Sequence, residues 1–271
     1  MRAFDPMQKS ETVMDRGERV ETARPEEKPI GTTRRAEQPL GTACQGATHD
    51  VLTSQRAEKW RGFFIALEGT DGSGKTTVLD GVKARFAAAG LDVLYTREPG
   101  GPPISEQIRA LLLDPDNEAM APMTEALLYA ASRAQHVQEV LRPALAAGHI
   151  VLSDRYVLSS IAYQGAGRGL GMGTVAAINS YAIGGLLPDL TLFLDVDPRE
   201  VLRRKARRVA ADRLEQAGDA FFENVYNGYQ QVLEKTPGAV RIDATRPAEE
   251  VIQDAWETIE ESLKAWRSET A

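Results

Sequence analysis

The stretch from Phe63 to Thr77, FFIALEGTDGSGKTT, constrains the fold more than any other part of the chain. Phe63–Leu67 is a short apolar run, which is typical of a buried central strand. Residues 69–76 then match the pattern G-x-x-x-x-G-K-[ST] in full, and Thr77–Ala89 is predicted to be a helix that ends at Gly90. A glycine-rich turn could match by chance, but strand, loop and helix follow in the order that a phosphate-binding loop requires.

The residue types of this loop suit the binding of a nucleoside triphosphate. Its glycines let backbone N–H groups surround phosphate oxygens where a Cβ would clash. Lys75 can reach the β- and γ-phosphates, the Thr76 hydroxyl can bind Mg²⁺, and the helix points its positive N-terminus at the anion. The motif does not specify the reaction. The predicted site comprises Gly69, Thr70, Asp71, Gly72, Ser73, Gly74, Lys75, Thr76 and Thr77.

Composition excludes several classes of protein. The 271 residues leave room for one α/β domain plus extra material, and the net charge of -7 argues against a general nucleic-acid binder. The chain has one cysteine, Cys44, so an internal disulfide and a cysteine-based metal site are excluded. No apolar run approaches the roughly 20 residues of a membrane span, and no apolar core of a signal peptide is present. We therefore expect a cytoplasmic protein with no membrane partner.

Two regions differ in composition. Residues 1–61 are rich in Arg, Glu, Thr, Gln, Pro and Gly, with few aromatic residues and no sustained periodicity. Such a segment buries too little apolar surface to offset the entropy cost of ordering it. We predict a disordered N-terminal extension over 1–61 and one folded domain over 62–271. The alternatives for the extension are a docking or regulatory arm and an over-long predicted start, with translation beginning further in.

Strand-like and helix-like segments alternate throughout the predicted domain. This alternation predicts an α/β fold with a five-stranded parallel sheet, helices on both faces, and ligands at the carboxyl ends of the strands. Beyond the first strand and helix, we expect strands at Asp92–Glu98, His149–Ser153, Leu190–Val196 and Val240–Asp243, and helices at Ile104–Leu113, Met123–Ala147 (kinked or broken near Pro143) and Ala248–Trp266.

Charged residues follow two of these strands. Arg97 begins the loop Arg-Glu-Pro-Gly-Gly and is a natural phosphate ligand, although a solvated arginine on a surface turn is the alternative. Asp154 ends the third predicted strand, where phosphate-loop enzymes place a carboxylate near Mg²⁺. A helix N-cap is the other interpretation of Asp154.

Helical spacing points to a site for a planar base. Tyr156, Ser160 and Gln164 lie four residues apart and would share one helix face, where Ser and Gln can donate and accept hydrogen bonds. Tyr129 and Arg133 have the same spacing and could cover one face and one edge of a base. Routine helix packing is the alternative for each set.

A basic cluster comes late in the chain. Arg203, Arg204, Lys205, Arg207 and Arg208 precede the segment Asp-Arg-Leu-Glu at 212–215. A solvated helix face is the simple interpretation. However, phosphoryl transfer needs a cation beyond the loop lysine, and the loop itself holds no arginine. A mobile arginine-rich lid would supply that charge.

Taken together, these segments resemble thymidylate kinase from about Gly62 to the C-terminus. The resemblance rests on EGTDGSGKTT, TREPGG, LLYAASRAQH, SDRYVLSSIAYQGAGRG, PDLTLFLDV and DRLEQAGDAFF, which occur in the family's order. It implies a nucleoside-monophosphate-kinase-like fold with an arginine-rich lid, transfer of the γ-phosphoryl of ATP to dTMP with Mg²⁺, and a homodimer. The N-K-x-D motif of GTP-binding proteins is absent.

The resemblance also implies an acceptor site. Asp71 would contact the sugar 3′-OH, Arg133 would bind thymine O4, and Tyr163 would crowd the 2′ position. Tyr129 stands where the family usually stacks thymine on Phe, and Pro102 stands where it usually has Thr. Gly165–Gly171 would form a loop at the edge of the pocket. The implied dTMP-binding residues are Asp71, Arg97, Arg109, Tyr129, Arg133, Arg155, Ser160, Tyr163 and Gln164.

Catalytic roles follow from the same resemblance. Because Gly72-Ser73 stands where some members carry a loop arginine, the chain resembles the bacterial branch with a lid arginine. The implied catalytic residues are Lys75, Asp71 and Arg155 together with lid candidates Arg207, Arg208 and Arg213, and Thr76 and Asp154 would hold Mg²⁺. Two rival functions are another nucleotide or deoxynucleoside kinase on this fold and a non-catalytic nucleotide-binding interaction module.

Overall fold

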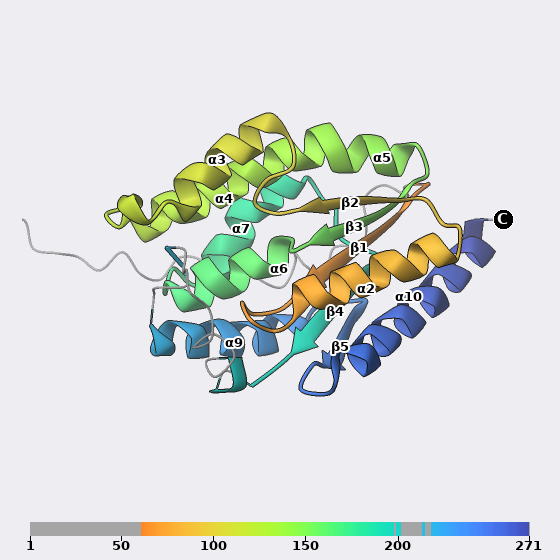
Figure 1. Cartoon of the computed structure of the whole chain (residues 1–271). Coiled ribbons are helices and arrows are strands. Elements are labelled where there is room, and N and C mark those ends of the chain that lie inside the picture. Colours follow the sequence, from red (N-terminus) through yellow and green to blue (C-terminus); the bar gives the residue numbers. More distant parts are fainter. Residues whose placement is uncertain (1–60, 198, 202–212, 215–217, 271) are drawn as a thin grey trace, which may run out of the picture. The chain divides into compact units, whose positions relative to one another are not determined.

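A computed structural model of the chain describes residues 61–197, 199–201, 213–214 and 218–270. Most of the predicted extension, the basic cluster at 203–208 and the lid candidates Arg207 and Arg208 lie outside these residues. The described part contains the predicted five-stranded parallel sheet, with strand order β2-β3-β1-β4-β5 (Figure 1). The strands are β1 (Phe63–Glu68), β2 (Val93–Arg97), β3 (Ile150–Asp154), β4 (Leu190–Asp195) and β5 (Ala239–Asp243).

Helices connect the strands as the alternating pattern predicts. The α-helices are α2 (Lys75–Ala88), α3 (Pro103–Leu113), α4 (Pro122–His136), α5 (Arg142–Ala146), α6 (Val157–Ser160), α7 (Met172–Ile183), α9 (Asp219–Leu233) and α10 (Ala248–Thr270). A short 3₁₀ helix, η1 (Pro115–Asn117), and two π-helical segments, η2 (Val137–Leu141) and η3 (Ile161–Gly167), complete them. None of the described helices is both long and apolar enough to cross a membrane.

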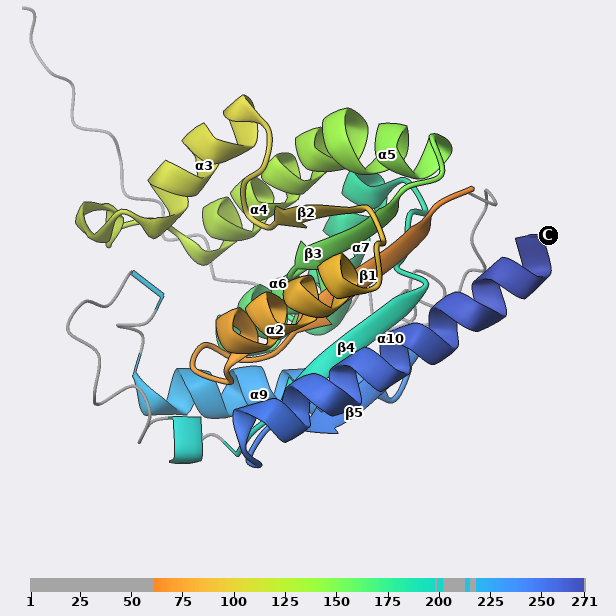
Figure 2. The same ribbon diagram turned by 45° about the vertical axis from the view of Figure 1, so that its right-hand side comes forward.

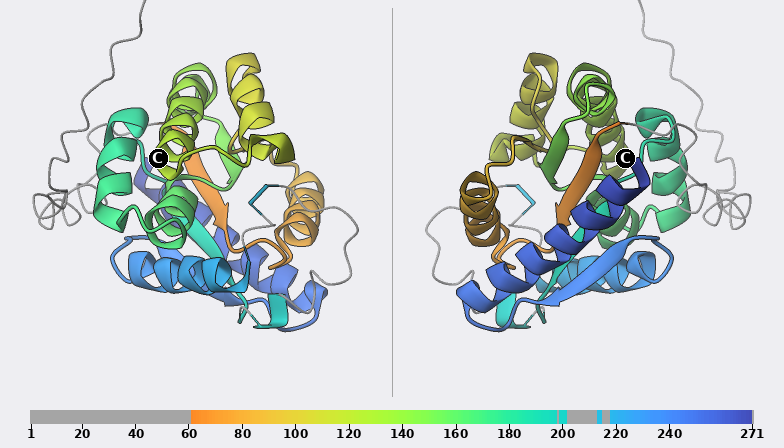
Figure 3. Two further views of the ribbon diagram at one scale, coloured as in Figure 1. Left: turned by 90° about the vertical axis from the view of Figure 1, so that its left-hand side faces the viewer. Right: turned by 90° about the vertical axis from the view of Figure 1, so that its right-hand side faces the viewer.

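Side-chain alternation along β1 divides the core into two layers. Phe63, Ile65 and Leu67 pack with α2 and α10, whereas Phe64 and Ala66 pack with α4 to α7 and α9 on the opposite face. Figures 2 and 3 show the sheet between these two sets of helices. All six residues of β1 are buried, as expected for the central strand of a parallel sheet covered on both faces.

The break predicted near Pro143 is confirmed, because the π-helical η2 interrupts the long helix about one turn before that proline, whose missing N–H favours such an irregularity. The helix ends at Ala146, one residue before the predicted Ala147. Helices α7 and α9 were not predicted. The loop expected at Gly165–Gly171 starts only at Arg168, because η3 extends through Gly167.

Strand register brings the functional segments to one edge of the sheet. In the two ladders of β3, Asp154 pairs with Leu67 on one side and with Arg97 on the other. The loops after β1, β2 and β3 therefore begin at the same level. This is the carboxyl edge at which parallel α/β sheets bind ligands.

Candidate functional site

The predicted phosphate-binding loop has the backbone that its glycines predict. Gly69, Gly72 and Gly74 have positive φ angles of 151°, 91° and 97°, which residues with a Cβ rarely adopt. A Cβ at Gly69 would also lie 2.7 Å from the Ser73 hydroxyl oxygen. Gly74 in turn caps the start of α2. The backbone geometry thus requires glycine at these positions.

Lys75 begins α2, and its side chain reaches back to the loop. Its side chain is buried, and Nζ donates hydrogen bonds of 2.9 Å to the carbonyl oxygens of Gly69 and Thr70. Burial lowers the pKa of Lys75 to about 8, and the nearby Arg155 acts in the same direction. An anionic ligand in the loop would favour the charged ammonium and raise this pKa again.

Arg155 joins the phosphate loop to the segments after β3. This residue has a positive φ of 71°, which is uncommon for a residue with a side chain. Its guanidinium donates to the Gly69 carbonyl oxygen at 2.8 Å and forms an ion pair with Asp71. The hydroxyl of Tyr163 donates to the other Asp71 oxygen at 2.8 Å. Burial disfavours the charged guanidinium, but Asp71, Tyr163, Tyr229 and Asp154 together outweigh it, so the pKa of Arg155 is raised and the residue stays cationic.

A buried carboxylate, that of Glu68, holds the backbone beside Arg155 in place. It accepts hydrogen bonds from the backbone N–H of Tyr156 at 2.9 Å, the N–H of Ser159 at 3.2 Å and the hydroxyl of Tyr229 at 2.9 Å. Burial raises the pKa of Glu68. Because it anchors the start of α6, Glu68 fixes the backbone next to Arg155. Sequence analysis assigned it no role, although a carboxylate that ends an apolar strand was a visible signal.

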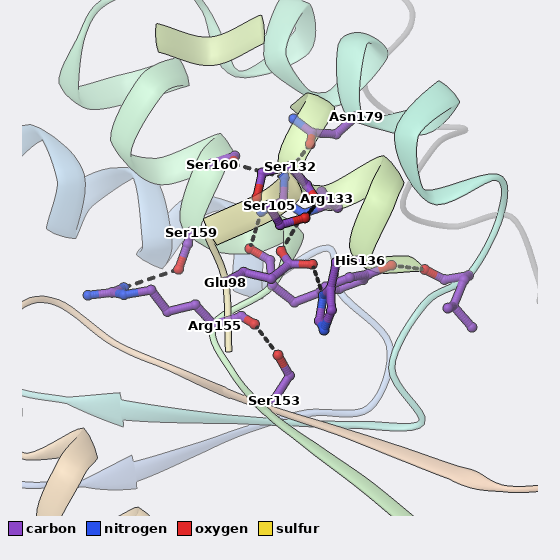
Figure 4. Close-up of polar contacts among 12 residues, drawn as sticks. Glu98, Ser105, Ser132, Arg133, His136, Ser153, Arg155, Ser159, Ser160 and Asn179 are labelled. Carbon is purple, nitrogen blue, oxygen red and sulfur yellow. Dashed lines mark hydrogen bonds and ion pairs between the residues drawn. The ribbon is translucent and has the colours of Figure 1, made fainter. Parts of the chain in front are cut away.

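Arg133 is held in a buried network that Figure 4 shows. Its Nε donates to Glu98 at 2.6 Å, Nη1 donates to the Ser160 hydroxyl at 2.9 Å and to Asn179, and Nη2 donates to the Tyr156 carbonyl at 3.1 Å. Four of its five N–H groups therefore have protein partners among the described residues. One N–H of Nη2 is left for a ligand.

Glu98 carries the charge that balances Arg133. The second oxygen of Glu98 lies 2.8 Å from His136 Nδ1, and the other ring nitrogen of His136 lies 2.7 Å from the Thr96 hydroxyl. Burial raises the pKa of Glu98, but Arg133 and His136 outweigh it and the net shift is downward. The carboxylate is therefore ionised and fixes the guanidinium plane. Glu98 belongs to the Arg-Glu-Pro-Gly-Gly segment that the sequence analysis described, but its pairing with Arg133 was not predicted.

A cavity of about 100 Å³ lies beside this network. Eight of the nine residues predicted to bind the acceptor line it, and the exception is Arg97. Sequence analysis did not single out the remaining five. The lining residues are Asp71, Glu98, Pro99, Arg109, Leu113, Tyr129, Arg133, Arg155, Ser159, Ser160, Tyr163, Gln164 and Leu214.

Arg97 lies apart from this cavity. Its side chain is 48% exposed and forms an ion pair with Glu106 at 2.8 Å. Glu106 also accepts a 2.7 Å hydrogen bond from the N–H of Gly101, and the N–H of Gly100 donates to Ser132. Both of these backbone N–H groups in the Gly-Gly loop are therefore hydrogen-bonded to protein side chains. Arg109, in contrast, lines the cavity and donates to the Pro99 carbonyl at 2.8 Å.

The four-residue spacing predicted that Tyr156 would share one helix face with Ser160 and Gln164. This prediction is wrong, because Tyr156 does not line the cavity. Its ring is buried in the core, and its hydroxyl donates to the Leu186 carbonyl at 2.9 Å. The reason is that Tyr156 precedes α6 in non-helical backbone, so the helical spacing does not extend to it. Ser160 and Gln164 both line the cavity.

Arg213 is in a buried ion pair. Its Nη2 lies 2.7 Å from Glu125, and its Nε donates to the Leu112 carbonyl at 2.9 Å. The next residue, Leu214, lines the cavity. Among the lid candidates, Arg213 is the one that the structure describes, and these two partners belong to α3 and α4.

Two residues were predicted to hold Mg²⁺. Asp154 is the last residue of β3, and Thr76 is the second residue of α2. Thr76 is exposed in the first turn of α2. Asp154 Oδ1 is buried and has no hydrogen-bond partner among the described residues, which makes it an available oxygen ligand. No group of three or more His, Cys, Asp or Glu residues is placed to hold a metal in the described parts of the chain.

Comparison with known proteins places the chain in a family. The family model described as "Thymidylate kinase" matches residues 67–255. A thymidylate kinase of Finegoldia magna is 52% identical over 72% of this chain and 97% of its own length. Thymidylate kinases of Lactobacillus delbrueckii subsp. bulgaricus and Deinococcus radiodurans are 53% and 49% identical over 71% and 74% of this chain, and over 92% and 98% of their own lengths. The chain belongs to the thymidylate kinase family.

Proposed function

We propose that the chain transfers the γ-phosphoryl group of ATP to dTMP and releases dTDP and ADP, a step toward dTTP. The observation that carries this proposal is the position of Arg155. Its guanidinium is bonded to the Gly69 carbonyl of the phosphate loop and also lines the cavity. A donor phosphate in the loop and an acceptor phosphate in the cavity would therefore meet at one fixed cation.

The cavity suits the edge of a thymine base. The remaining N–H of Arg133 can donate to thymine O4, and Gln164 Oε1, which is buried without a partner among the described residues, can accept from N3–H. Tyr129 lines the same cavity and can cover the face of the ring. Arg109 and Arg155 are the cations available to the acceptor phosphate.

The sugar would lie against Asp71 and Tyr163. The Asp71 carboxylate is fixed by Arg155 and by the hydroxyl of Tyr163, so it can accept a hydrogen bond from a 3′-OH without reorganising. The Tyr163 ring, buried beside it, would occupy the space that a 2′-OH needs. This arrangement favours deoxyribonucleotides.

Catalysis would rest on positioning and charge neutralisation. The acceptor phosphate is already an anion, so no general base is needed. Lys75 would exchange the carbonyls of Gly69 and Thr70 for the β- and γ-phosphate oxygens. Arg155 would offset the repulsion between the two substrates. Because Arg213 is paired with Glu125, we propose that Arg207 or Arg208 is the lid arginine.

We propose that Asp154 and Thr76 would hold Mg²⁺. The unpartnered Asp154 Oδ1 and the exposed Thr76 hydroxyl fit such an ion, because Mg²⁺ at phosphate sites usually takes one or two protein oxygens. When bound, the ion would neutralise charge on the transferring phosphoryl group.

We also propose that the chain acts in the cytoplasm as a homodimer and that residues 1–61 are dispensable for turnover. These proposals rest on the resemblance to the family and on the composition of that segment. Size-exclusion chromatography with light scattering would test the dimer, since a monomer mass would contradict it.

An acceptor panel tests the function directly. We expect ADP release with ATP and Mg²⁺ to be fastest with dTMP among dTMP, dUMP, dCMP, dGMP and AMP, both for the full chain and for a chain that lacks residues 1–59. A preference for another acceptor would identify a different nucleotide kinase. ATP binding with no acceptor-dependent ADP release would identify a non-catalytic module.

A further inference from the structure

Glu125 is a buried carboxylate outside the cavity lining. It lies in the first turn of α4 with 1% of its side chain exposed. Its two oxygens have different partners. Oε2 accepts from Arg213 Nη2 at 2.7 Å and forms an ion pair with Arg168 Nη2 at 3.1 Å, whereas Oε1 accepts from the side-chain amide of Gln164 at 2.9 Å. Arg168 Nε lies 3.3 Å and 3.2 Å from the two oxygens.

This environment determines which way the Gln164 amide points. Arg213 and Arg168 both pair with Glu125, and a carboxylate in such ion pairs only accepts hydrogen bonds. Gln164 must therefore turn its NH₂ group toward Glu125. Its carbonyl oxygen is then the amide atom left for a ligand, and that oxygen is buried without a partner among the described residues. Gln164 itself is 1% exposed and lines the cavity.

We propose that Glu125 is a positioning residue that selects thymine over cytosine by fixing the orientation of the Gln164 amide. The inference rests on the proposed function. Thymine presents an acceptor at O4 and a donor at N3, which match the donor of Arg133 and the acceptor of Gln164. Cytosine presents a donor at N4 and an acceptor at N3, which mismatch both. A site whose buried polar groups are left unpaired rejects the wrong ligand strongly.

Glu125→Gln tests this idea with almost no change in shape. The oxygen of the new amide would face Arg213 and Arg168, because both can only donate. Its NH₂ would then face Gln164, and the Gln164 amide would have to turn over and present its own NH₂ to the base. We expect the ratio of kcat/KM for dTMP to that for dCMP to fall about 10- to 100-fold, mainly through a higher KM for dTMP.

Glu139→Gln is the matched control. Glu139 also accepts a hydrogen bond from a glutamine amide, that of Gln135, but this pair is exposed. We expect its dTMP-to-dCMP ratio to equal that of the unaltered chain. An unchanged Tm would show that the Glu125→Gln variant folds. If this folded variant kept the dTMP-to-dCMP ratio of the unaltered chain, the proposal would be overturned.

A measurement on the unaltered chain covers the case in which Glu125→Gln does not fold. In NMR spectra of labelled protein, dTMP should shift the side-chain carbonyl carbon of Gln164 and leave its amide protons near their starting positions. Large shifts of the amide protons with an unmoved carbonyl would overturn the proposal. Failure of the proposed function would look different, because the unaltered chain would then show no preference for dTMP.

Discussion

Lys75→Ala is expected to lower kcat with ATP and dTMP by about 10²- to 10³-fold, which is the usual cost of removing one pre-positioned donor from a charge-stabilising site. Lys75 is the cation that the loop holds beside the phosphate position, through hydrogen bonds to the Gly69 and Thr70 carbonyls. In the proposed mechanism its charge stabilises the transferring phosphoryl group, so the loss should appear in kcat. Steady-state ADP release under saturating substrates measures it.

Lys83→Ala is the control for this variant. Lys83 lies on the same helix, is partly exposed and pairs with Asp80 at 3.5 Å. We expect near-normal kcat for Lys83→Ala and unchanged dTMP binding for both variants. Turnover near the wild-type rate in Lys75→Ala would contradict the assignment of the phosphate loop.

Arg133→Ala is expected to raise the KM for dTMP by about 100-fold and to destabilise the fold by about 3–5 kcal/mol. The first effect is the loss of the donor to thymine O4. The second arises because Glu98, with 2% of its side chain exposed, would lose its guanidinium partner and remain as a poorly compensated buried charge. The resemblance to the family implied only the contact of Arg133 with thymine O4. Substrate titration and denaturant unfolding measure the two effects separately.

A double variant separates the structural role of Arg133 from its binding role. In Arg133→Met with Glu98→Gln, both charges are removed together, so much of the stability should return while the KM for dTMP stays high. If the KM returned to the wild-type value along with stability, Arg133 would be purely structural. An unchanged KM in Arg133→Ala would lead to the same conclusion.

The sequence was sufficient to predict the sheet and the phosphate loop because both depend on local pattern. Apolar runs of strand length, separated by helical segments, specify a parallel α/β sheet, and the glycine positions of 69–74 specify the loop backbone. Helix α9 was not predicted, although its apolar residues Phe222, Val225, Tyr229 and Val232 do recur at helical spacing and are buried. This spacing is itself sufficient to predict the helix.

The ion pairs of the site could not be predicted from the sequence. Glu98 and Arg133 are 35 residues apart, and Glu125 and Arg213 are 88 residues apart, so their pairing depends on how the helices pack. Arg97 is a separate case. It was predicted to bind phosphate because it ends a strand beside the site, and its side chain forms an ion pair with Glu106, nine residues further along the chain.

The most direct test of this account is a crystal structure of the chain with dTMP. We predict the nucleotide in the cavity lined by Tyr129 and Arg155, with thymine O4 at Arg133 Nη2, N3–H at Gln164 Oε1 and the phosphate at Arg155. Thymidylate bound elsewhere on the chain, or bound here with its base directed away from Arg133 and Gln164, would contradict the account.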